Sequence, residues 1–242
     1  LFWANYYADK SEHDYLSKVN TYLKDVGSPY EVILKDHKDN ILERLSFKTR
    51  KGLATISDGP LVSVIVASYN AASTINYALE SLLSQTYSNI EILVCDDQSN
   101  DSTYAILDRF RSDSRIRIFK SNSNQGPYNI RNQLISQAKG EIITFHDADD
   151  IAFPHRIALQ LQLMMQSKSR ISLGLWLRIN KNGNFIAFKD GSYLRQCLNS
   201  IMFTNTVFYD YGPFREALFA ADSEFYEKIK GQVSPNDISD VT

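Results

Sequence analysis

The sequence has few cysteines, no long apolar run and almost no net charge, and each of these shortages excludes a class of protein. Only two of the 242 residues are cysteine, Cys95 and Cys197, and they lie far apart. A disulfide framework and a cysteine-rich zinc site are therefore excluded. Cys95 falls inside an apolar run, where a small thiol is an ordinary core residue. We expect both thiols to be reduced, as in a cytoplasmic protein.

Transmembrane segments and nucleic-acid partners are not expected either. The longest apolar runs, such as residues 61–67, are far shorter than the ~20 residues that span a bilayer. Residues 1–20 lack the basic and apolar regions of a signal peptide. The chain has 26 Lys and Arg against 28 Asp and Glu, a formal net charge of -2. No general field therefore attracts nucleic acid or an acidic membrane.

The two ends of the chain suggest that it is a piece of a longer protein. The first residue is Leu1 rather than Met, and the last residues are polar. We therefore expect the chain to be truncated, also on its C-terminal side. Peripheral association with the inner face of a membrane would then involve parts outside this chain.

Two regions with different patterns follow one another along the chain. Ser11 can cap a helix over the apolar positions 15–26, and a second amphipathic helix is expected around residues 41–45. Residues 55–60 favour a turn. We therefore predict a helical N-terminal extension at residues 1–58 and one larger domain at residues 59–242. Hydrophobic residues make up 43% of the chain, enough for a substantial core.

From residue 61 onward, apolar β-branched runs alternate with helical periodicities, which favours an α/β fold with a doubly wound, mostly parallel sheet. The alternating strands are predicted at 62–67, 90–95, 116–119 and 141–146, and the helices between them at 73–85, 102–111 and 127–138. Beyond residue 150 the pattern is mixed, so we expect antiparallel strands to be added to the sheet. The predicted elements there are a helix from Pro154, strands at 171–179 and 184–188 around an Asn-Gly turn, a strand at 200–208 and a helix at 222–230.

Polar clusters follow each of the four parallel strands. Ligands of such sheets bind at the carboxyl ends of the strands, so these clusters are expected to line one edge. They are Ser68-Tyr69-Asn70, residues 96–101, residues 122–126 and Asp147-Ala148-Asp149-Asp150.

Three carboxylates close together after the fourth strand need an explanation. Two unit charges ~4 Å apart repel by about 4 kcal/mol at an effective dielectric constant of 20. Asp147 and Asp149 can point to the same side and suit Mg²⁺ or Mn²⁺, which completes its shell with substrate phosphates. The alternative is that these aspartates cap the helix near Pro154 and meet solvent.

Other polar residues near the strand ends also allow two interpretations. Asp96 and Asp97 can cap the next helix, or accept hydrogen bonds from a nucleotide. Arg131 can reach a phosphate or face water. Gly126 precedes a helix N-terminus, which is a natural neighbour of a phosphate. Asp222 and Glu224 lie in the first turn of a predicted helix, where they can act as caps or take a proton from a hydroxyl.

Together these residues resemble the inverting glycosyltransferases of family 2, which have the GT-A fold. The resemblance runs from Val62 to about Lys230 and leaves residues 1–58 unexplained. Its order and spacing make it specific. The matching segments are "VSVIVASYN", "EILVCDDQSNDST", "NQGPYNIRNQLISQAKGEIITFHDADD" and "ADSEFYEKI".

The resemblance implies a role for each candidate residue. Asp147 and Asp149 would hold Mn²⁺ or Mg²⁺ on the donor diphosphate, with Asp149 the first choice for the direct ligand. Asp222 would take the proton of the acceptor hydroxyl, supported by Glu224. The residues implied in binding the nucleotide-sugar donor are Ser68, Tyr69, Asn70, Asp96, Asp97, Gly126, Arg131, Asp147 and Ala148.

The implied reaction moves a sugar, with inversion, to a hydroxyl of a glycan or a lipid-linked saccharide, as in the synthesis of bacterial surface polysaccharides. A UDP-sugar is the first choice of donor. Two other functions remain open on the residues alone. Asp147 and Asp149 also fit the nucleophile and acid of an Asp-x-Asp phosphohydrolase, and the domain could bind a nucleotide or glycan without catalysis.

The sequence departs from the family pattern at three points. Gln98 replaces the usual loop glycine, which is tolerable where the backbone needs no positive φ. Ala221 replaces an acidic residue before the base, which leaves the choice between Asp222 and Glu224 open. A Gln-x-x-Arg-Trp segment is absent, which disfavours a processive membrane synthase.

Overall fold

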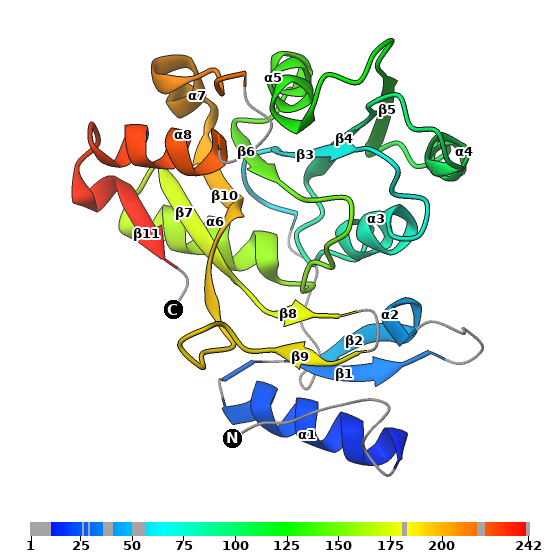
Figure 1. Cartoon of the computed structure of the whole chain (residues 1–242). Coiled ribbons are helices and arrows are strands. Elements are labelled where there is room, and N and C mark those ends of the chain that lie inside the picture. The colour runs from blue at the N-terminus through cyan, green and yellow to red at the C-terminus, as the bar shows by residue number, and fades with distance from the viewer. Residues whose placement is uncertain are drawn as a thin grey trace. The chain divides into compact units, whose positions relative to one another are not determined.

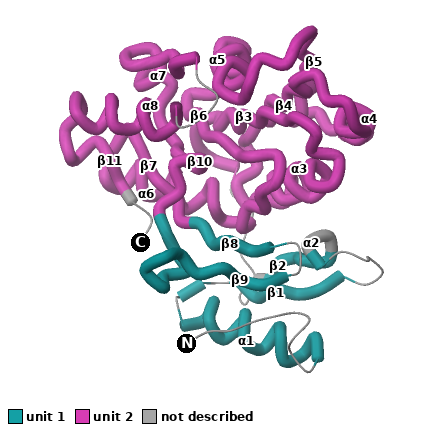
Figure 2. The backbone as a smooth tube through the Cα atoms, viewed as in Figure 1, with its two compact units in different colours: residues 1–54, 176–195 teal, residues 55–175, 196–242 magenta. Residues whose placement is uncertain are grey.

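The computed structural model describes residues 11–25, 27–28, 30–35, 41–49, 57–180, 183–216 and 221–240. The chain divides into two compact units (Figure 2). One unit comprises residues 1–54 and 176–195, and the other comprises residues 55–175 and 196–242. The grouping of residues 176–195 with the N-terminal unit was not predicted from the sequence. Among the described residues, no helix has the length and apolar character needed to cross a membrane.

The N-terminal unit contains strands as well as helices. Its elements are α1 (Glu12–Asp25), β1 (Tyr30–Leu34), α2 (Ile41–Arg44), β2 (Leu45–Thr49), β8 (Arg178–Ile179) and β9 (Phe185–Ile186). Ser11 caps α1 as predicted, because its Oγ accepts a hydrogen bond from the Asp14 amide at 3.1 Å. The second predicted helix is only four residues long, since residues 45–49 pair with β1 in an antiparallel ladder. The term "helical extension" is therefore wrong for residues 30–34 and 45–49, which are strands. The division after residue 58 stays a prediction, and residues 55 and 56 of the predicted turn lie outside the described residues.

One sheet of seven strands organises the larger unit, in the order β11-β7-β10-β6-β3-β4-β5. The strands β3, β4, β5 and β6 run parallel to one another, β10 is antiparallel to β6, and β11 is parallel to β7. The predicted parallel sheet with added antiparallel pairing is therefore confirmed. The bounds are β3 (Val62–Ser68), β4 (Ile90–Asp96), β5 (Ile116–Lys120), β6 (Ile142–Phe145), β7 (Ile171–Trp176), β10 (Arg195–Thr204) and β11 (Ile238–Asp240).

Helices cover both faces of this sheet (Figure 1). Alternate residues of β3 and β4 enter two separate cores, as expected for side chains that point to opposite faces along a strand. Val64 packs with α3, α4 and α6, whereas Ile65 packs with α5, α7 and α8. The helices are α3 (Ile75–Leu83), α4 (Thr103–Asp108), α5 (Pro127–Gln137), α6 (Arg156–Ser167), α7 (Asn205–Tyr211) and α8 (Ala221–Lys230). Cys95 and Cys197 are both free and buried, as predicted.

One predicted element is displaced. The strand expected at 200–208 runs over Arg195–Thr204, and the chain then turns into α7. The Asn205 amide donates to the Glu141 carbonyl at 2.8 Å, just before β6 begins, so the ladder with β6 ends there. Tertiary pairing therefore overrides the strand propensity of residues 205–208.

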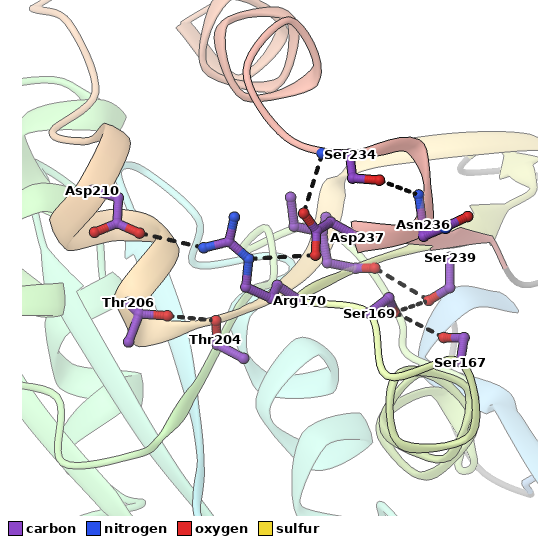
Figure 3. Close-up of polar contacts among 11 residues, drawn as sticks. Ser167, Ser169, Arg170, Thr204, Thr206, Asp210, Ser234, Asn236, Asp237 and Ser239 are labelled. Carbon is purple, nitrogen blue, oxygen red and sulfur yellow. Dashed lines mark hydrogen bonds and ion pairs between the residues drawn. The ribbon is translucent and has the colours of Figure 1, made fainter.

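Polar contacts hold the C-terminal segment against the start of β7. Figure 3 shows Arg170 between Asp210 of α7 and Asp237, which belongs to the short 3-10 helix η1 (Pro235–Asp237). The Arg170 Nη1 to Asp210 Oδ2 distance is 3.3 Å, and Arg170 Nε lies 3.6 Å from Asp237 Oδ1. Ser169 Oγ donates to Ser239 Oγ at 2.8 Å. These contacts lie at the amino ends of the strands, away from the polar clusters.

The turn before β6 gives a stability test. A Cβ at Gly140 would lie 2.5 Å from Ser63 Oγ and 2.7 Å from the Leu61 carbonyl oxygen. We expect Gly140→Ala to lower the free energy of unfolding by roughly 1–3 kcal/mol, because the backbone must shift. Gly231→Ala is the control, since its nearest atom lies at 3.5 Å, and we expect a change within about 0.5 kcal/mol. Urea denaturation measures both, and equal midpoints would contradict the close approach.

Candidate active site

The polar clusters meet at the carboxyl ends of β3, β4, β5 and β6, as the sequence predicts. Ser68 and Asp96 are paired in register at the ends of β3 and β4. The Asp97 amide donates to the Ser68 carbonyl at 2.8 Å, and the Ser121 amide donates to the Asp96 carbonyl at 2.9 Å. The loops after three neighbouring strands are thus hydrogen-bonded to one another. Helix α5 connects this edge to the loop after β6 through Arg131 and Asp147.

Asp96 is a fully buried carboxylate at the carboxyl end of β4. Its relative exposure is 0%, and neither carboxylate oxygen has a hydrogen-bond partner among the described residues. Burying an unpaired charge is costly. The cap of α4 does not explain it, because Asp101 instead accepts from the Thr103 amide at 2.9 Å. The side chain is therefore suited to accept hydrogen bonds from a ligand.

Asp97 differs from its neighbour because both of its oxygens are used. They accept hydrogen bonds from the backbone amides of Gln125, at 2.9 and 3.1 Å, and Gly126, at 2.8 Å. Gly126 has a φ of +82° and is followed by Pro127 as the first residue of α5, a combination that favours a defined helix start. Asp97 therefore fixes the loop before α5, which makes its predicted contact with a ligand less direct.

Gln98 corrects an expectation drawn from the sequence. The backbone at this position has a φ of +60°, in the left-handed region that normally favours glycine and costs other residues about 1–2 kcal/mol. The Gln98 side chain offsets part of this cost. Its Nε2 donates to the Asn122 carbonyl at 3.1 Å, and its Oε1 accepts from the Asn124 amide at 3.1 Å. Glutamine thus replaces glycine where a positive φ is needed.

In the cluster Ser68-Tyr69-Asn70, only the Tyr69 side chain has no hydrogen bond to another described residue. Ser68 Oγ donates to the Cys95 carbonyl at 2.9 Å, and Asn70 Oδ1 accepts from the Asn100 amide at 2.9 Å. Ser68 therefore links the end of β3 to β4, and Asn70 links the loop after β3 to the loop after β4. Tyr69 lies between them and is 47% exposed, so its ring is available to stack on a ligand.

Asp147 is held from two sides. Arg131 Nη2 of α5 donates to Asp147 Oδ1 at 2.6 Å, and Asn199 Nδ2 of β10 donates to Asp147 Oδ2 at 2.5 Å. Arg131 is buried, with its guanidinium 5.0 Å from the centre of the Phe145 ring. Its Nε has no hydrogen-bond partner among the described residues. Arg131 thus faces an acidic group rather than water.

The aspartates of this cluster differ in how deeply their carboxylates are buried. Burial, with the charges of Asp147 and Asp149, raises the pKa of Asp150 to about 7. Burial also raises the pKa of Asp147, against the opposing effect of Arg131. Asp149 is exposed, and no hydrogen bond or ion pair joins it to any part of the chain that the structure describes. Helix α6 begins only after His155, so these aspartates do not cap it.

The donor set at this loop fits a hard divalent cation that takes few protein ligands. Within the described ranges, no group of three or more His, Cys, Asp or Glu side chains could hold a metal ion. Mg²⁺ and Mn²⁺ sites of one or two carboxylates plus phosphate oxygens need no such group. Asp149 offers a carboxylate that no described residue pairs. Burial is the main cause of the raised pKa of Asp150, and the repulsion from Asp147 and Asp149 that adds to it is the kind a cation offsets. The residues present therefore fit the ion that the sequence suggests.

Asp222 and Glu224 lie on different sides of α8, because residues two apart on a helix point ~200° apart. The Tyr128 hydroxyl donates to Asp222 Oδ1 at 2.9 Å, and burial raises the pKa of Tyr128 so that it keeps this proton. Asp222 lies close enough to Asp147 to raise the pKa of that carboxyl. Glu224 forms an exposed ion pair with Arg215 at 3.0 Å. The geometry thus brings Asp222 to the acidic cluster and leaves Glu224 in solvent.

Three residues of the site were missed from the sequence. Tyr128 and Asn199 contact the candidate residues directly, but nothing in their local sequence marks them. Arg156 Nη2 donates to the Phe145 carbonyl at 2.9 Å, and its charge acts on Asp150. A signal existed for Arg156, because it lies four residues before Gln160 on the otherwise apolar buried face of α6.

The comparisons with known proteins agree with this arrangement. The model of the family "Glycosyl transferase family 2" matches residues 63–223. Two Escherichia coli proteins named UDP-Glc:alpha-D-GlcNAc-diphosphoundecaprenol beta-1,3-glucosyltransferase are similar to this chain. WfgD is 38% identical over 146 residues, 58% of this chain and 57% of that protein. WfaP is 44% identical over 108 residues, 45% and 43% respectively. The chain thus spans about half the length of these relatives.

A solved structure shows the same fold. The crystal structure of S. aureus TarS 1-349 matches with a TM-score of 0.61 and 25% sequence identity. The match covers 74% of this chain and 57% of that one. The GT-A fold expected from the sequence is confirmed by this similarity.

The two neighbouring aspartates after β4 give opposite expectations for stability. We expect Asp96→Asn to raise the free energy of unfolding by roughly 1–3 kcal/mol, because it removes a buried carboxylate that no described residue pairs. Asp97→Asn is the matched variant, and we expect it to lower that free energy by about 1–3 kcal/mol through weaker hydrogen bonds to the loop before α5. Denaturation of both variants at neutral pH is the measurement. A loss of stability in Asp96→Asn as large as in Asp97→Asn would contradict the difference.

Proposed function

Because this chain belongs to glycosyltransferase family 2, we propose that it transfers a hexosyl or N-acetylhexosaminyl group from a UDP-sugar to a hydroxyl of a lipid-linked saccharide. The reaction inverts the anomeric configuration and depends on Mn²⁺ or Mg²⁺. The proposal depends on one observation above all, which is the buried and unpartnered Asp96 carboxylate at the end of β4. Asp96 is the last residue of a parallel strand, and sheets of this class bind nucleotides at the carboxyl ends of their strands.

Donor binding is proposed at the edge formed by β3 and β4. Asp96 accepts hydrogen bonds from an N–H of the base or from a ribose hydroxyl, which would satisfy both of its oxygens. Tyr69 stacks on the base, an arrangement that its 47% exposure supports. Asp97 and Gly126 act less directly, because they set the start of α5. UDP is the proposed nucleotide, since the names of WfgD and WfaP both include UDP-Glc.

The acceptor class is proposed from the same relatives. Both names specify a GlcNAc residue on diphosphoundecaprenol, which is a lipid-linked sugar. An acceptor of this chemistry places the reaction at a membrane face, in the synthesis of a surface polysaccharide. Because the chain spans about half of each relative, parts outside it are proposed to contribute to acceptor and membrane binding.

A divalent cation is proposed to bind the donor diphosphate beside Asp149. When bound, it stabilises the negative charge that develops on the departing nucleoside diphosphate. Asp149 is the proposed direct ligand, since its carboxylate is exposed and unpaired among the described residues. Asp147 supports the loop, because both of its oxygens already accept hydrogen bonds.

Asp222 is proposed as the general base. One of its oxygens accepts a hydrogen bond from Tyr128, which orients the carboxylate and leaves the second oxygen for the acceptor hydroxyl. The acceptor oxygen bonds to the anomeric carbon as the bond from that carbon to the diphosphate oxygen breaks, and Asp222 takes the hydroxyl proton. Glu224 is a weaker candidate, because it pairs with Arg215.

The contacts of Asp147 disfavour the phosphohydrolase alternative. A nucleophilic aspartate needs an oxygen free to attack phosphorus, whereas Arg131 and Asn199 each hold one oxygen of Asp147. The transfer assay of the second experiment below separates the non-catalytic alternative from the transferase.

The first experiment tests the cation. Asp149→Ala is expected to weaken Mn²⁺-dependent binding of UDP by ~10-fold or more, because it removes the proposed direct ligand. Asp222→Asn is the comparison, with binding close to wild type. Isothermal titration with UDP, with Mn²⁺ or with EDTA, measures both. Equal losses in the two variants would contradict the division of roles.

The second experiment tests the base. Asp222→Asn is expected to reduce transfer from UDP-glucose to a synthetic GlcNAc-diphosphate lipid by ~10²–10⁴-fold, because no group then takes the hydroxyl proton. Glu224→Gln is the matched control, with a rate within about twofold of wild type, since surface ion pairs contribute little. UDP release is the measurement. The opposite ranking of the two variants would reassign the base to Glu224.

A further inference from the structure

The two hydrogen bonds on Asp147 fix its carboxylate in one orientation. Arg131 reaches Oδ1 from helix α5, and Asn199 reaches Oδ2 from strand β10. One donor on each oxygen, from elements on either side of the loop, prevents rotation of the carboxylate plane. Arg131 is a charged, buried donor, so its pairing with Asp147 is expected from electrostatics alone. Asn199 is neutral, and its position needs a separate explanation.

The register of β10 on β6 places Asn199 opposite Asp147. The ladder pairs Thr204 with Ile142, Phe203 with Ile143 and Met202 with Thr144. In an antiparallel pair, each step back along one strand is a step forward along the other. The same register, continued past the end of β6, brings residue 199 to residue 147. The contact between the two side chains is thus a consequence of how β10 is added to the sheet.

Two polar side chains of α6, Arg156 and the buried Gln160, hold β10 at this point. Arg156 Nη2 donates to the Phe145 carbonyl at 2.9 Å and to the Ser200 carbonyl at 3.3 Å. Gln160 Nε2 donates to the same Ser200 carbonyl at 2.9 Å. The last residue of β6 and the residue after Asn199 are therefore joined through one guanidinium group. Arg156 thus holds the end of β6 and the neighbour of Asn199 close together, which keeps Asn199 within hydrogen-bond distance of Asp147.

We propose that Asn199 is a positioning residue for the diphosphate end of the donor site. It holds Asp147 so that the buried Ala148 turn presents Asp149 outward. This inference rests on the proposed function, since it assigns Asn199 to the same cation and diphosphate. An amide suits the task because it donates a hydrogen bond without adding charge, so the cluster keeps the negative charge that binds a cation. Asn199 itself touches neither the donor nor the ion.

The test compares UDP binding with and without Mn²⁺ in Asn199→Ala. We expect UDP affinity in the presence of Mn²⁺ to fall by ~10–100-fold, the usual effect of removing a residue that orients a metal ligand. UDP affinity in EDTA should change by less than about twofold, because Asp96 and Tyr69 are untouched. Asn205→Ala is the matched control, since this asparagine also donates from its side chain, to the Gly140 carbonyl at 3.3 Å, but at the opposite end of the strands. Its ratio of the two affinities should equal that of the wild type.

A double-mutant cycle separates positioning from a general loss of structure. In an Asp147→Ala background, Asn199→Ala should cause no further loss of Mn²⁺-dependent UDP affinity, because its partner is already gone. If the alanine variant folds poorly, Asn199→Ser replaces it in the test. The serine side chain is too short to reach Asp147, so the same loss of Mn²⁺-dependent UDP affinity is expected. Equal losses of UDP affinity with Mn²⁺ and with EDTA would overturn the proposed role of Asn199, and so would additive losses in the cycle. Either result would leave the proposed function standing. A wild type that binds no UDP in the same titration would overturn the proposed function with it.

Discussion

The ion pair between Arg131 and Asp147 is the interaction on which the site depends. Four carboxylates gather where β6 ends, and burial, with their mutual repulsion, raises the pKa of Asp147 and Asp150. The buried Arg131 offsets part of that repulsion from α5, and Arg156 offsets part of it from α6. Four carboxylates against two guanidinium groups leave the cluster with an excess of acidic groups. The remaining negative charge supports the proposed binding of a cation with a diphosphate.

Binding and stability make opposite demands on adjacent residues of the loop after β4. Asp97 contributes to the fold through three hydrogen bonds to backbone amides. Asp96 costs stability, since it is buried with no partner among the described residues. Gln98 holds a positive φ that glycine would hold without strain, and its side chain ties the loops together. Strain and unpaired charge thus concentrate where the ligand is proposed to bind, as is common at functional sites.

The family match and the compact units divide the chain differently. The family model spans residues 63–223, yet residues 176–195 within that range group with residues 1–54. Inside that unit, the hydroxyl group of the buried Tyr15 of α1 donates a hydrogen bond to the Gly183 carbonyl at 3.0 Å. Residues 176–195 therefore contact the N-terminal segment within one compact unit, although the family model includes them.

The sequence by itself determined the parallel strands, the helices between them and the four polar clusters at one edge. These follow from apolar periodicity and turn residues, which are local properties of the chain. Only the tertiary structure decided that Asp96 is unpaired while Asp97 is saturated, that β10 ends at residue 204, and that Asn199 meets Asp147. Each depends on which distant segment lies alongside, and strand register is set by the packing of the whole sheet rather than by local propensity.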